Sequence, residues 1–273
     1  MDIRLIAMDL DGTALRKDHK TFSPRLLEAL EEAHRRGVEI APVTGRQYGL
    51  LPDFLKTHPV WENLAVLANG AQIRNLGTGE IHHRLDISGH ALRELLEVSE
   101  RYGLPMEFSV DSTLHLTKRD YDAQRPYPNL AFHRETILAY HGRIVPSLEP
   151  LCTQQVEKVN LLCIPAQLRE QVDAELKKIA VSAVWASSSS MEITHPDATK
   201  GKGVQALCQL LGLSMASVMA LGDSGNDETM LRQAGLGVAM GNAPEEVKSW
   251  ADAVTDTNDN DGAAIAIEQF VLN

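Results

Sequence analysis

Cysteine and long apolar runs are both scarce in this sequence. The three cysteines, Cys152, Cys163 and Cys208, are odd in number and follow no zinc-ligand spacing. We therefore expect buried, reduced thiols rather than disulfides or a zinc site. No run approaches the ~20 apolar residues of a membrane-spanning helix, and the first apolar stretch lacks the features of a signal peptide. These absences argue against a secreted or integral membrane protein, and we expect a cytoplasmic protein with no membrane partner.

Positive charge is also in short supply. The chain has 26 lysines and arginines against 37 aspartates and glutamates, which gives a formal net charge of -11. Such a chain repels polyanions, so we expect no nucleic-acid partner. A small phosphate remains compatible with this charge, because a divalent cation and a few basic side chains can reverse the sign locally.

The two ends of the chain alternate strands and helices, which predicts a parallel sheet with right-handed crossovers. Ser23 is the expected cap and Pro24 the expected first residue of a helix that ends at Gly37. The other elements follow from their apolar spacing. We expect strands at 3–8, 38–43, 64–68, 218–221 and 237–240, and helices at 204–211, 228–234, after Pro244 and at 263–271.

The middle of the chain has a different pattern, from about residue 85 to residue 190. Apolar and polar residues alternate there in short runs, which predicts an antiparallel sheet with one wet or half-covered face. We expect strands at 106–110, 113–117, 159–164 and 181–186, and helices at 89–102 and 167–179. Residues 191–194 fit either this sheet or the return to the first pattern, and residues 119–129 receive no assignment. The 273 residues, 44% of them hydrophobic, can thus bury more than one core.

Four polar segments carry the chemistry, and three of them stand where an expected strand ends. They are Asp9-Leu10-Asp11-Gly12-Thr13, Val43-Thr44-Gly45-Arg46, Thr199-Lys200-Gly201 and Gly222-Asp223-Ser224-Gly225-Asn226-Asp227. In an open α/β sheet, ligands bind at the carboxyl ends of the strands. Each segment taken alone is also compatible with a polar turn or a helix cap, and the functional interpretation depends on the four occurring together.

These segments supply the groups that phosphoryl transfer needs. Asp9 can act as the nucleophile and form an aspartyl phosphate. Asp11 can protonate the leaving alkoxide and then deprotonate the attacking water. Asp9, Asp223 and the main-chain carbonyl of Asp11 can hold Mg²⁺, which prefers oxygen ligands.

The phosphate itself needs fixed donors. The Thr44 hydroxyl, the neighbouring main-chain N–H groups and Lys200 can supply them. Gly12 and Gly45 let the main chain approach a phosphate closely. Arg46 has two readings: it can meet a second anion of the substrate, or it can form a salt bridge between the core and a loop.

In this order the segments resemble the haloacid dehalogenase (HAD) superfamily of phosphatases. More narrowly, the chain is similar to the Cof-type subgroup, which acts on sugar phosphates and related small metabolites. Ala68-Asn69-Gly70-Ala71 and Met240-Gly241-Asn242-Ala243 also look like features of that subgroup.

The resemblance implies an α/β fold with a Rossmann-like parallel-sheet core and a large inserted α+β cap of the C2 type. The core is expected at 1–84 and 191–273, and the cap, which sets substrate specificity, at 85–190. The resemblance further implies three metal ligands, Asp9, Asp11 and Asp223. Asn226 and Asp227 would lie behind these ligands or on a metal-bound water, and Asn242 near the phosphate or the Lys200 side chain.

The expected function is a Mg²⁺-dependent phosphatase of small phosphorylated metabolites, with sugar phosphates as the first candidates. Open alternatives are a pyridoxal phosphate or nucleotide phosphatase, a phosphomutase or phosphotransferase, and a non-catalytic protein that binds a phosphometabolite. We expect a monomer or a homodimer. The expected substrate-binding residues are Gly12, Gly45, Arg46, Asn69, Gly70 and Asn242. In the cap, the candidates for leaving-group contacts are His115, Lys118, Arg119, Tyr121, Arg125 and His133.

Overall fold

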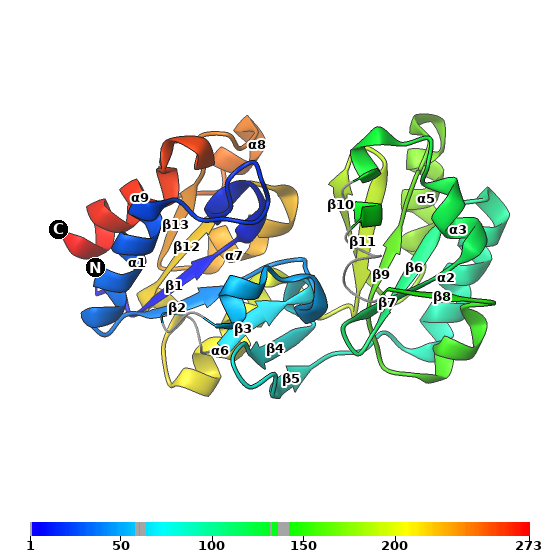
Figure 1. The fold of residues 1–273 in the computed structure, drawn as a ribbon, viewed down its shortest axis with the longest axis horizontal. Coiled ribbons are helices and arrows are strands. Elements are labelled where there is room, and N and C mark those ends of the chain that lie inside the picture. The colour runs from blue at the N-terminus through cyan, green and yellow to red at the C-terminus, as the bar shows by residue number, and fades with distance from the viewer. Residues whose placement is uncertain (1, 58–59, 61–63, 132, 136–141) are drawn as a thin grey trace. The chain divides into compact units, whose positions relative to one another are not determined.

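The computed structural model describes residues 2–57, 60, 64–131, 133–135 and 142–273. The chain forms two compact units (Figure 1). Unit 1 comprises Met1–Arg46, Leu51–His83 and Thr199–Asn273, and unit 2 comprises Gln47–Leu50 and Arg84–Ala198. None of the helices among the described residues is long and apolar enough to cross a membrane.

Five parallel strands form the main sheet of unit 1, in the spatial order β14-β13-β12-β1-β2. They are β1 (Leu5–Met8), β2 (Glu39–Pro42), β12 (Val218–Gly222), β13 (Leu236–Ala239) and β14 (Ala253–Val254). Every residue of β1 and β12 is buried, as is typical of parallel strands covered on both faces. The parallel sheet predicted from the strand–helix alternation is therefore confirmed.

The helices of unit 1 pack in two groups. They are α1 (Pro24–Arg35), α6 (Lys200–Leu211), α7 (Glu228–Gln233), α8 (Glu245–Lys248) and α9 (Gly262–Ile267). Val204 of α6 and Met230 of α7 pack with Leu5 and Ala7 of β1 in one apolar cluster, whereas α1 and α9 lie side by side (Figure 1). The predicted cap of α1 is confirmed, because the Ser23 side chain accepts a hydrogen bond from the N–H of Leu26.

Unit 1 also holds a small sheet that the sequence analysis expected only in part. Strands β3 (Leu64–Leu67), β4 (Gln72–Asn75) and β5 (Ile81–Arg84) lie in that order, and β3 pairs with β4 antiparallel. A single parallel bridge between Val43 and Val66 joins β3 to the end of β2. The expected strand at 64–68 thus exists, but its main partner is a hairpin strand that the alternation pattern did not predict.

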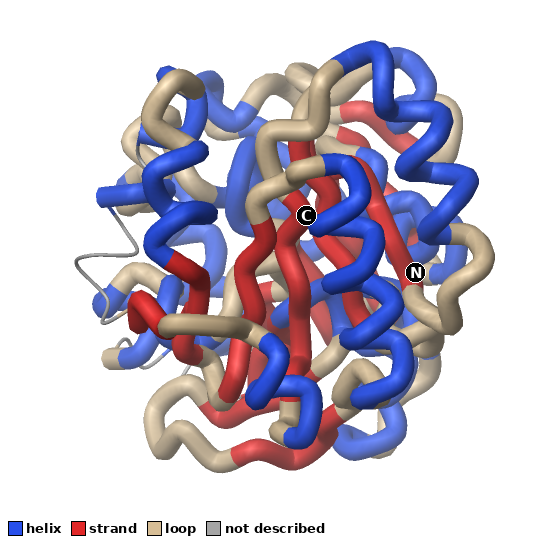
Figure 2. Tube along the Cα trace, turned by 90° about the vertical axis from the view of Figure 1, so that its right-hand side faces the viewer, coloured by secondary structure: helices blue, strands red, loops and turns tan. Residues whose placement is uncertain are grey.

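Six strands form the sheet of unit 2, in the order β10-β11-β9-β6-β7-β8. They are β6 (Met106–Val110), β7 (Thr113–Thr117), β8 (Arg143–Val145), β9 (Val156–Leu161), β10 (Ser182–Ser187) and β11 (Ser190–Thr194). Among the residues that the structure describes, the helices of this unit are α2 (Gly89–Tyr102), α3 (Lys118–Ala123) and α5 (Arg169–Leu176). Figure 2 traces the whole chain with helices in blue, strands in red, and loops and turns in tan.

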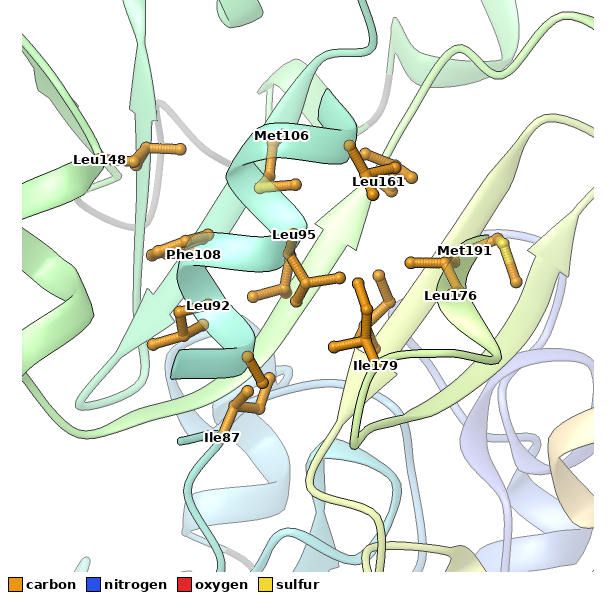
Figure 3. Close-up of a cluster of buried hydrophobic side chains, with 14 of the residues drawn as sticks. Ile87, Leu92, Leu95, Met106, Phe108, Leu148, Leu161, Leu176, Ile179 and Met191 are labelled. Carbon is orange, nitrogen blue, oxygen red and sulfur yellow. The ribbon is translucent and has the colours of Figure 1, made fainter. Parts of the chain in front are cut away.

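The core of unit 2 lies between this sheet and the helices α2 and α5. Leu92 and Leu95 of α2 point toward the sheet beside Met106 and Phe108 of β6 (Figure 3). Leu176 of α5 belongs to the same cluster. Apolar residues at alternate strand positions therefore face the helices, as the period-two pattern predicted. The expected wet face is not found at β9, where all six residues are buried.

Two details of unit 2 differ from the sequence-based expectations, and two segments left open there have assignments in the structure. The sheet is mixed rather than wholly antiparallel, because β7 and β8 run parallel. The unassigned stretch contains α3, and β9 begins three residues before the expected 159. Strand β11 pairs with β9 and β10, so residues 191–194 belong to this sheet. Unit 2 extends to Ala198.

Candidate active site

Three polar segments meet at the carboxyl ends of adjacent strands in unit 1. Asp9 follows β1, Thr44 follows β2 and Asp223 follows β12. Strand β1 lies between the other two, and the N–H of Asp9 donates to the carbonyl of Leu221 at 3.0 Å. The strand order therefore brings together segments that lie far apart in the sequence, at the edge where α/β sheets bind ligands.

Lys200 lies between two buried carboxylates. Its Nζ is 2.6 Å from Oδ1 of Asp9 and 2.6 Å from Oδ1 of Asp227. The lysine side chain is 1% exposed, and those of Asp9 and Asp227 are 5% and 0% exposed. Lys200 is the first residue of α6, which the Thr199 side chain caps by accepting from the N–H of Lys202. Charges this deeply buried are stable only when paired.

The pKa values of this group are strongly perturbed. Burial raises the pKa of Asp9 well above its usual value, against the opposing effect of Lys200, and the Asp227 and Asp223 carboxylates add to the rise. Burial and then Asp227 raise the pKa of Asp223 to about 6. Burial lowers the pKa of Lys200, but Asp227 and Asp9 outweigh it, so the pKa is raised and the amine stays protonated. The carboxylates carry more negative charge than one ammonium balances.

The carboxylates of this group fit a divalent cation. Asp9, Asp223 and Asp227 each offer an oxygen, and these oxygens lie within 4.8 Å of one another. An all-oxygen donor set suits Mg²⁺, and a cation would stabilise the ionised forms of Asp9 and Asp223. Both oxygens of Asp227 already have partners, since Oδ1 accepts from Lys200 and Oδ2 from the N–H groups of Asp223 and Ser224.

The loop Leu10–Ala14, here called the Asp11 loop, packs directly against Asp223. Thr13 Oγ1 donates to Asp223 Oδ1 at 3.2 Å. Gly12 has a φ of +80°, and a Cβ added there would collide with the Asp223 carboxylate. Only glycine tolerates both the left-handed conformation and this close approach.

The carboxylate of Asp11 is held by two basic residues. Arg46 donates to it through Nε at 2.7 Å and Nη2 at 2.6 Å, and Nδ1 of His19 lies 2.9 Å from Oδ1. Burial alone would raise the pKa of Asp11, but the bonds from His19 and Arg46 outweigh it and hold the pKa below its usual range. For Arg46 the structure has the salt bridge rather than a free guanidinium. The Asp11 side chain is not among the carboxylates that cluster around Lys200. A bound metal would therefore contact Asp11 through its main-chain carbonyl.

Thr44 and Asn69 lie on adjoining segments. The buried Thr44 hydroxyl oxygen accepts from the N–H of Arg46 at 3.1 Å, with the half-buried Gly45 between them. The N–H of Asn69 donates to the Thr44 carbonyl, and the Asn69 side chain accepts from Asn226 at 3.0 Å. Gly70, with a φ of +101°, packs so closely on the Thr199 carbonyl that a Cβ would not fit. Main-chain packing thus accounts for Gly70.

Asn242 bridges the Asp11 loop and Asp223. Its Nδ2 donates to the Gly12 carbonyl at 2.9 Å and lies 3.4 Å from Asp223 Oδ2. Its Oδ1 accepts from the N–H of Asn258 at 3.0 Å. The contacts of Lys200, by contrast, are with Asp9 and Asp227, so these contacts do not join Asn242 to the lysine.

Each cap candidate has a partner inside unit 2. The His133 side chain bonds to the buried Glu107, and that of His115 to the Thr113 carbonyl. The remaining candidates pair with acidic residues or pack on the sheet. Lys118 and Arg125 pair with Asp122, Arg119 pairs with Asp120, and Tyr121 packs on Leu114 and Leu116.

Three residues of the site were missed by the sequence analysis. Thr13 stood in a quoted motif without a role, whereas His19 and Asn258 stood in no motif at all. Since His19 and Asn258 act through contacts across turns and across the chain, no local spacing could have revealed them.

Comparisons with known proteins identify the family of this chain. The model of the haloacid dehalogenase-like hydrolases matches residues 6–267. The YxeH protein of Bacillus subtilis is 34% identical over 98% of both chains. A second B. subtilis protein, named 5-amino-6-(5-phospho-D-ribitylamino)uracil phosphatase YcsE, is 29% identical over 100% of this chain and 97% of its own. A haloacid dehalogenase-like hydrolase from Bacteroides thetaiotaomicron has a crystal structure that superposes with a TM-score of 0.81, at 26% identity over 98% of this chain and 99% of that one. With a family match that spans nearly its whole length, the chain belongs to the haloacid dehalogenase-like hydrolases.

Proposed function

We propose that this protein is a Mg²⁺-dependent phosphatase that hydrolyses small phosphorylated metabolites, sugar phosphates first among them, through a phosphorylated Asp9. The observation that carries the proposal is the buried Lys200 between Asp9 and Asp227, with Asp223 beside them. A cluster of buried charged side chains with perturbed pKa values adds little to stability. Such clusters at the ends of strands are typical of catalytic sites.

In the first step a carboxylate oxygen of Asp9 attacks phosphorus. The new bond joins Asp9 to phosphorus, and the bond from phosphorus to the leaving oxygen breaks. Asp11 gives its proton to the departing alkoxide. In the second step Asp11 takes a proton from water, the water oxygen attacks phosphorus, and inorganic phosphate leaves with Asp9 restored.

Asp11 must change partners to perform both steps. With Arg46 and His19 bonded to it, Asp11 is ionised and is suited to the second step. To carry the proton needed in the first step it must leave Arg46. We assign this exchange to the arrival of the substrate, whose phosphate competes for the guanidinium.

The remaining polar groups bind and orient the phosphate. Lys200 holds Asp9 in place and offsets the charge that gathers on the phosphoryl oxygens. The Thr44 hydroxyl and the main-chain N–H groups next to it are the other donors. Asp227, with both oxygens engaged, holds Lys200 and the turn after Asp223.

Asp9, Asp223 and the main-chain carbonyl of Asp11 would hold Mg²⁺. When bound, the ion supplies positive charge that lowers the repulsion between the phosphate and the carboxylates. The carboxylate side of the site fits this role, because Asp9 and Asp223 have raised pKa values that a neighbouring cation would lower.

The substrate class rests on two supports. The resemblance to the Cof-type subgroup points to sugar phosphates, and the printed name of YcsE describes a phosphorylated ribityl chain, which is a phosphate ester of a sugar alcohol. Both are small polyhydroxylated phosphate monoesters.

The test is phosphate release from a panel of sugar phosphates, sugar-alcohol phosphates, pyridoxal phosphate and nucleotides, with Mg²⁺ and with EDTA, and no added acceptor. We expect release that requires both the metal and Asp9, so that Asp9→Asn is inactive. Asp53→Asn, a change at an exposed aspartate of the same unit, is the matched control and should be fully active. No release from any member, or equal rates in Asp9→Asn, would contradict the proposal.

A further inference from the structure

We propose that Asn258 is a positioning residue, which fixes the Asp11 loop for the phosphoryl transfer. This inference rests on the proposed function for its kinetic consequence, and its structural consequence can be measured separately. Asn258 Nδ2 donates to the carbonyl of Leu15 at 3.0 Å. Leu15 directly follows the Asp11 loop, so this bond holds the end of the loop from outside.

A second contact of Asn258 reaches the middle of the same loop. Its N–H donates to Asn242 Oδ1, which turns the Asn242 Nδ2 toward the Gly12 carbonyl. The carbonyls of Gly12 and Leu15 are thereby held by two asparagines that are bonded to each other. Thr13, which bonds Asp223, lies between Gly12 and Leu15 in the sequence. Gly12 itself directly follows Asp11.

The Asp11 loop needs such support because its conformation is irregular. Asp11 has φ −77° and ψ 119°, and Gly12 has φ 80° and ψ −3°, so neither continues a helix. Inside the loop, the N–H of Leu15 donates to the Leu10 carbonyl at 2.8 Å, and that of Ala14 to the Asp9 carbonyl at a longer 3.3 Å. A loop of this kind keeps one conformation only when its surroundings specify it.

The segment that carries Asn258 is itself fixed to the sheet of unit 1. The N–H of Thr255 donates to the Ala239 carbonyl of β13 at 3.0 Å, and the Thr255 hydroxyl donates to the Gly262 carbonyl at 2.7 Å. Gly262 approaches the Asp256 carbonyl so closely that any side chain there would collide with it. Asn258 therefore transmits the position of the sheet edge to the Asp11 loop.

The kinetic consequence follows from what the loop carries. Asp11 performs both proton transfers in the proposed mechanism, whereas Lys200 and Thr44, which bind the phosphate, belong to other segments. Loss of the Asn258 side-chain bond should displace Asp11 and leave much of the phosphate site intact. Displacements of about 1 Å from a distant change can lower a rate by up to about 100-fold. We expect kcat to fall while KM stays nearly constant.

The experiment compares three variants of the full chain. Asn258→Ala removes the donor and keeps the N–H that bonds Asn242. Asn258→Asp keeps the shape but places a carboxylate oxygen against the Leu15 carbonyl. Asn260→Ala is the matched control, because Asn260 is exposed on the same segment and its side chain bonds Asp256 instead of the loop.

The expected result is a kcat lowered by about tenfold to about 100-fold in both Asn258 variants, with KM changed less than about twofold and the control unchanged. Hydrogen exchange of the peptide over residues 10–15 should be faster in both variants than in the wild type. Unchanged exchange of this peptide would overturn the proposal, whether or not the wild type is active. Faster exchange with an unchanged kcat would overturn the positioning role. If the wild type is inactive and exchange is faster in the variants, the proposed function is contradicted. The conclusion that Asn258 supports the Asp11 loop then still holds.

Discussion

Lys200 and Asp9 form a buried ion pair, with Nζ 2.6 Å from Oδ1, although 191 residues of sequence separate them. The same ammonium bonds Asp227, so one cation serves two carboxylates in a part of the protein from which water is excluded. The fold brings α6 onto the end of β1 to make this contact.

Replacement of Lys200 by methionine should destabilise the protein by about 3 to 5 kcal/mol, because two buried carboxylates lose their partner. Denaturant unfolding measures this loss. The control is Lys202→Met, at an exposed position two residues further along the same helix. This change should alter the free energy of unfolding by less than about 0.5 kcal/mol. Equal losses in the two variants would show that the buried pairing contributes nothing.

Replacement of Gly12 by alanine should abolish most activity and cost about 1 to 3 kcal/mol of stability. The cost comes from the positive φ and from the collision of the new methyl group with Asp223. Gly212→Ala separates the two causes, since Gly212 has a φ of +67° with no atom within 4 Å of the added Cβ. That variant should lose a similar strain energy with its activity intact. Equal activity loss in both would refute the steric argument.

The pair of His133 and the buried Glu107 should make the stability of unit 2 depend on pH. Although burial opposes the charge on His133, Glu107 raises the His133 pKa above 6.5. Burial alone would raise the pKa of Glu107. The charge of His133 and hydrogen bonds from His133, Asn160 and Gln124 outweigh burial and hold this pKa below 4.5. The contribution of His133 to the free energy of unfolding is present below pH 6.5 and is lost as the pH rises through the raised pKa of His133. The glutamate contribution is present above pH 4.5 and is lost as pH falls through the lowered value.

The pair therefore stabilises the fold between these limits. His133→Gln should lower the free energy of unfolding more at about pH 6 than at about pH 9, in urea titrations of the full chain. His90→Gln, at a histidine whose side chain is 85% exposed, should show little difference between the two conditions. A loss of unfolding free energy that is the same at both pH values in His133→Gln would show that the ion pair does not stabilise the fold.

Metal binding should stabilise the folded state by an amount that grows with the free Mg²⁺ concentration relative to the dissociation constant. We expect the melting temperature to rise on addition of Mg²⁺ and to return on addition of EDTA. Because Asp223→Asn removes one of the grouped carboxylates, the rise should be much smaller in that variant. Asp53→Asn should keep the full rise. A shift that is the same in all three proteins would place the metal elsewhere.

Sequence reasoning reached the main features of this fold because they are local or periodic. The family and the α/β fold are confirmed, and so is the Ser23 cap, which needs only a neighbouring N–H group. The placement of Asp9, Thr44 and Asp223 at one edge followed from the rule that ligands bind at the ends of parallel strands.

Other features depend on pairing that the sequence does not display. Strands β4 and β5 have the mixed sequences QIRN and IHHR, without alternation, and β4 forms because it pairs with β3 through a tight connection. Strand β8 has three residues, too few for a period. Asn258 reaches Leu15 across 243 residues of sequence, and only the folded chain shows that contact.

Chemical trapping can show whether Asp9 carries the phosphoryl group during turnover. The enzyme is quenched during turnover of its best substrate with Mg²⁺ and treated with borohydride, which reduces a phosphorylated aspartate to homoserine. We expect homoserine at position 9 in the peptide that contains β1, and none when EDTA replaces Mg²⁺. An intact Asp9 in enzyme quenched at full turnover, or homoserine at another aspartate, would contradict this expectation.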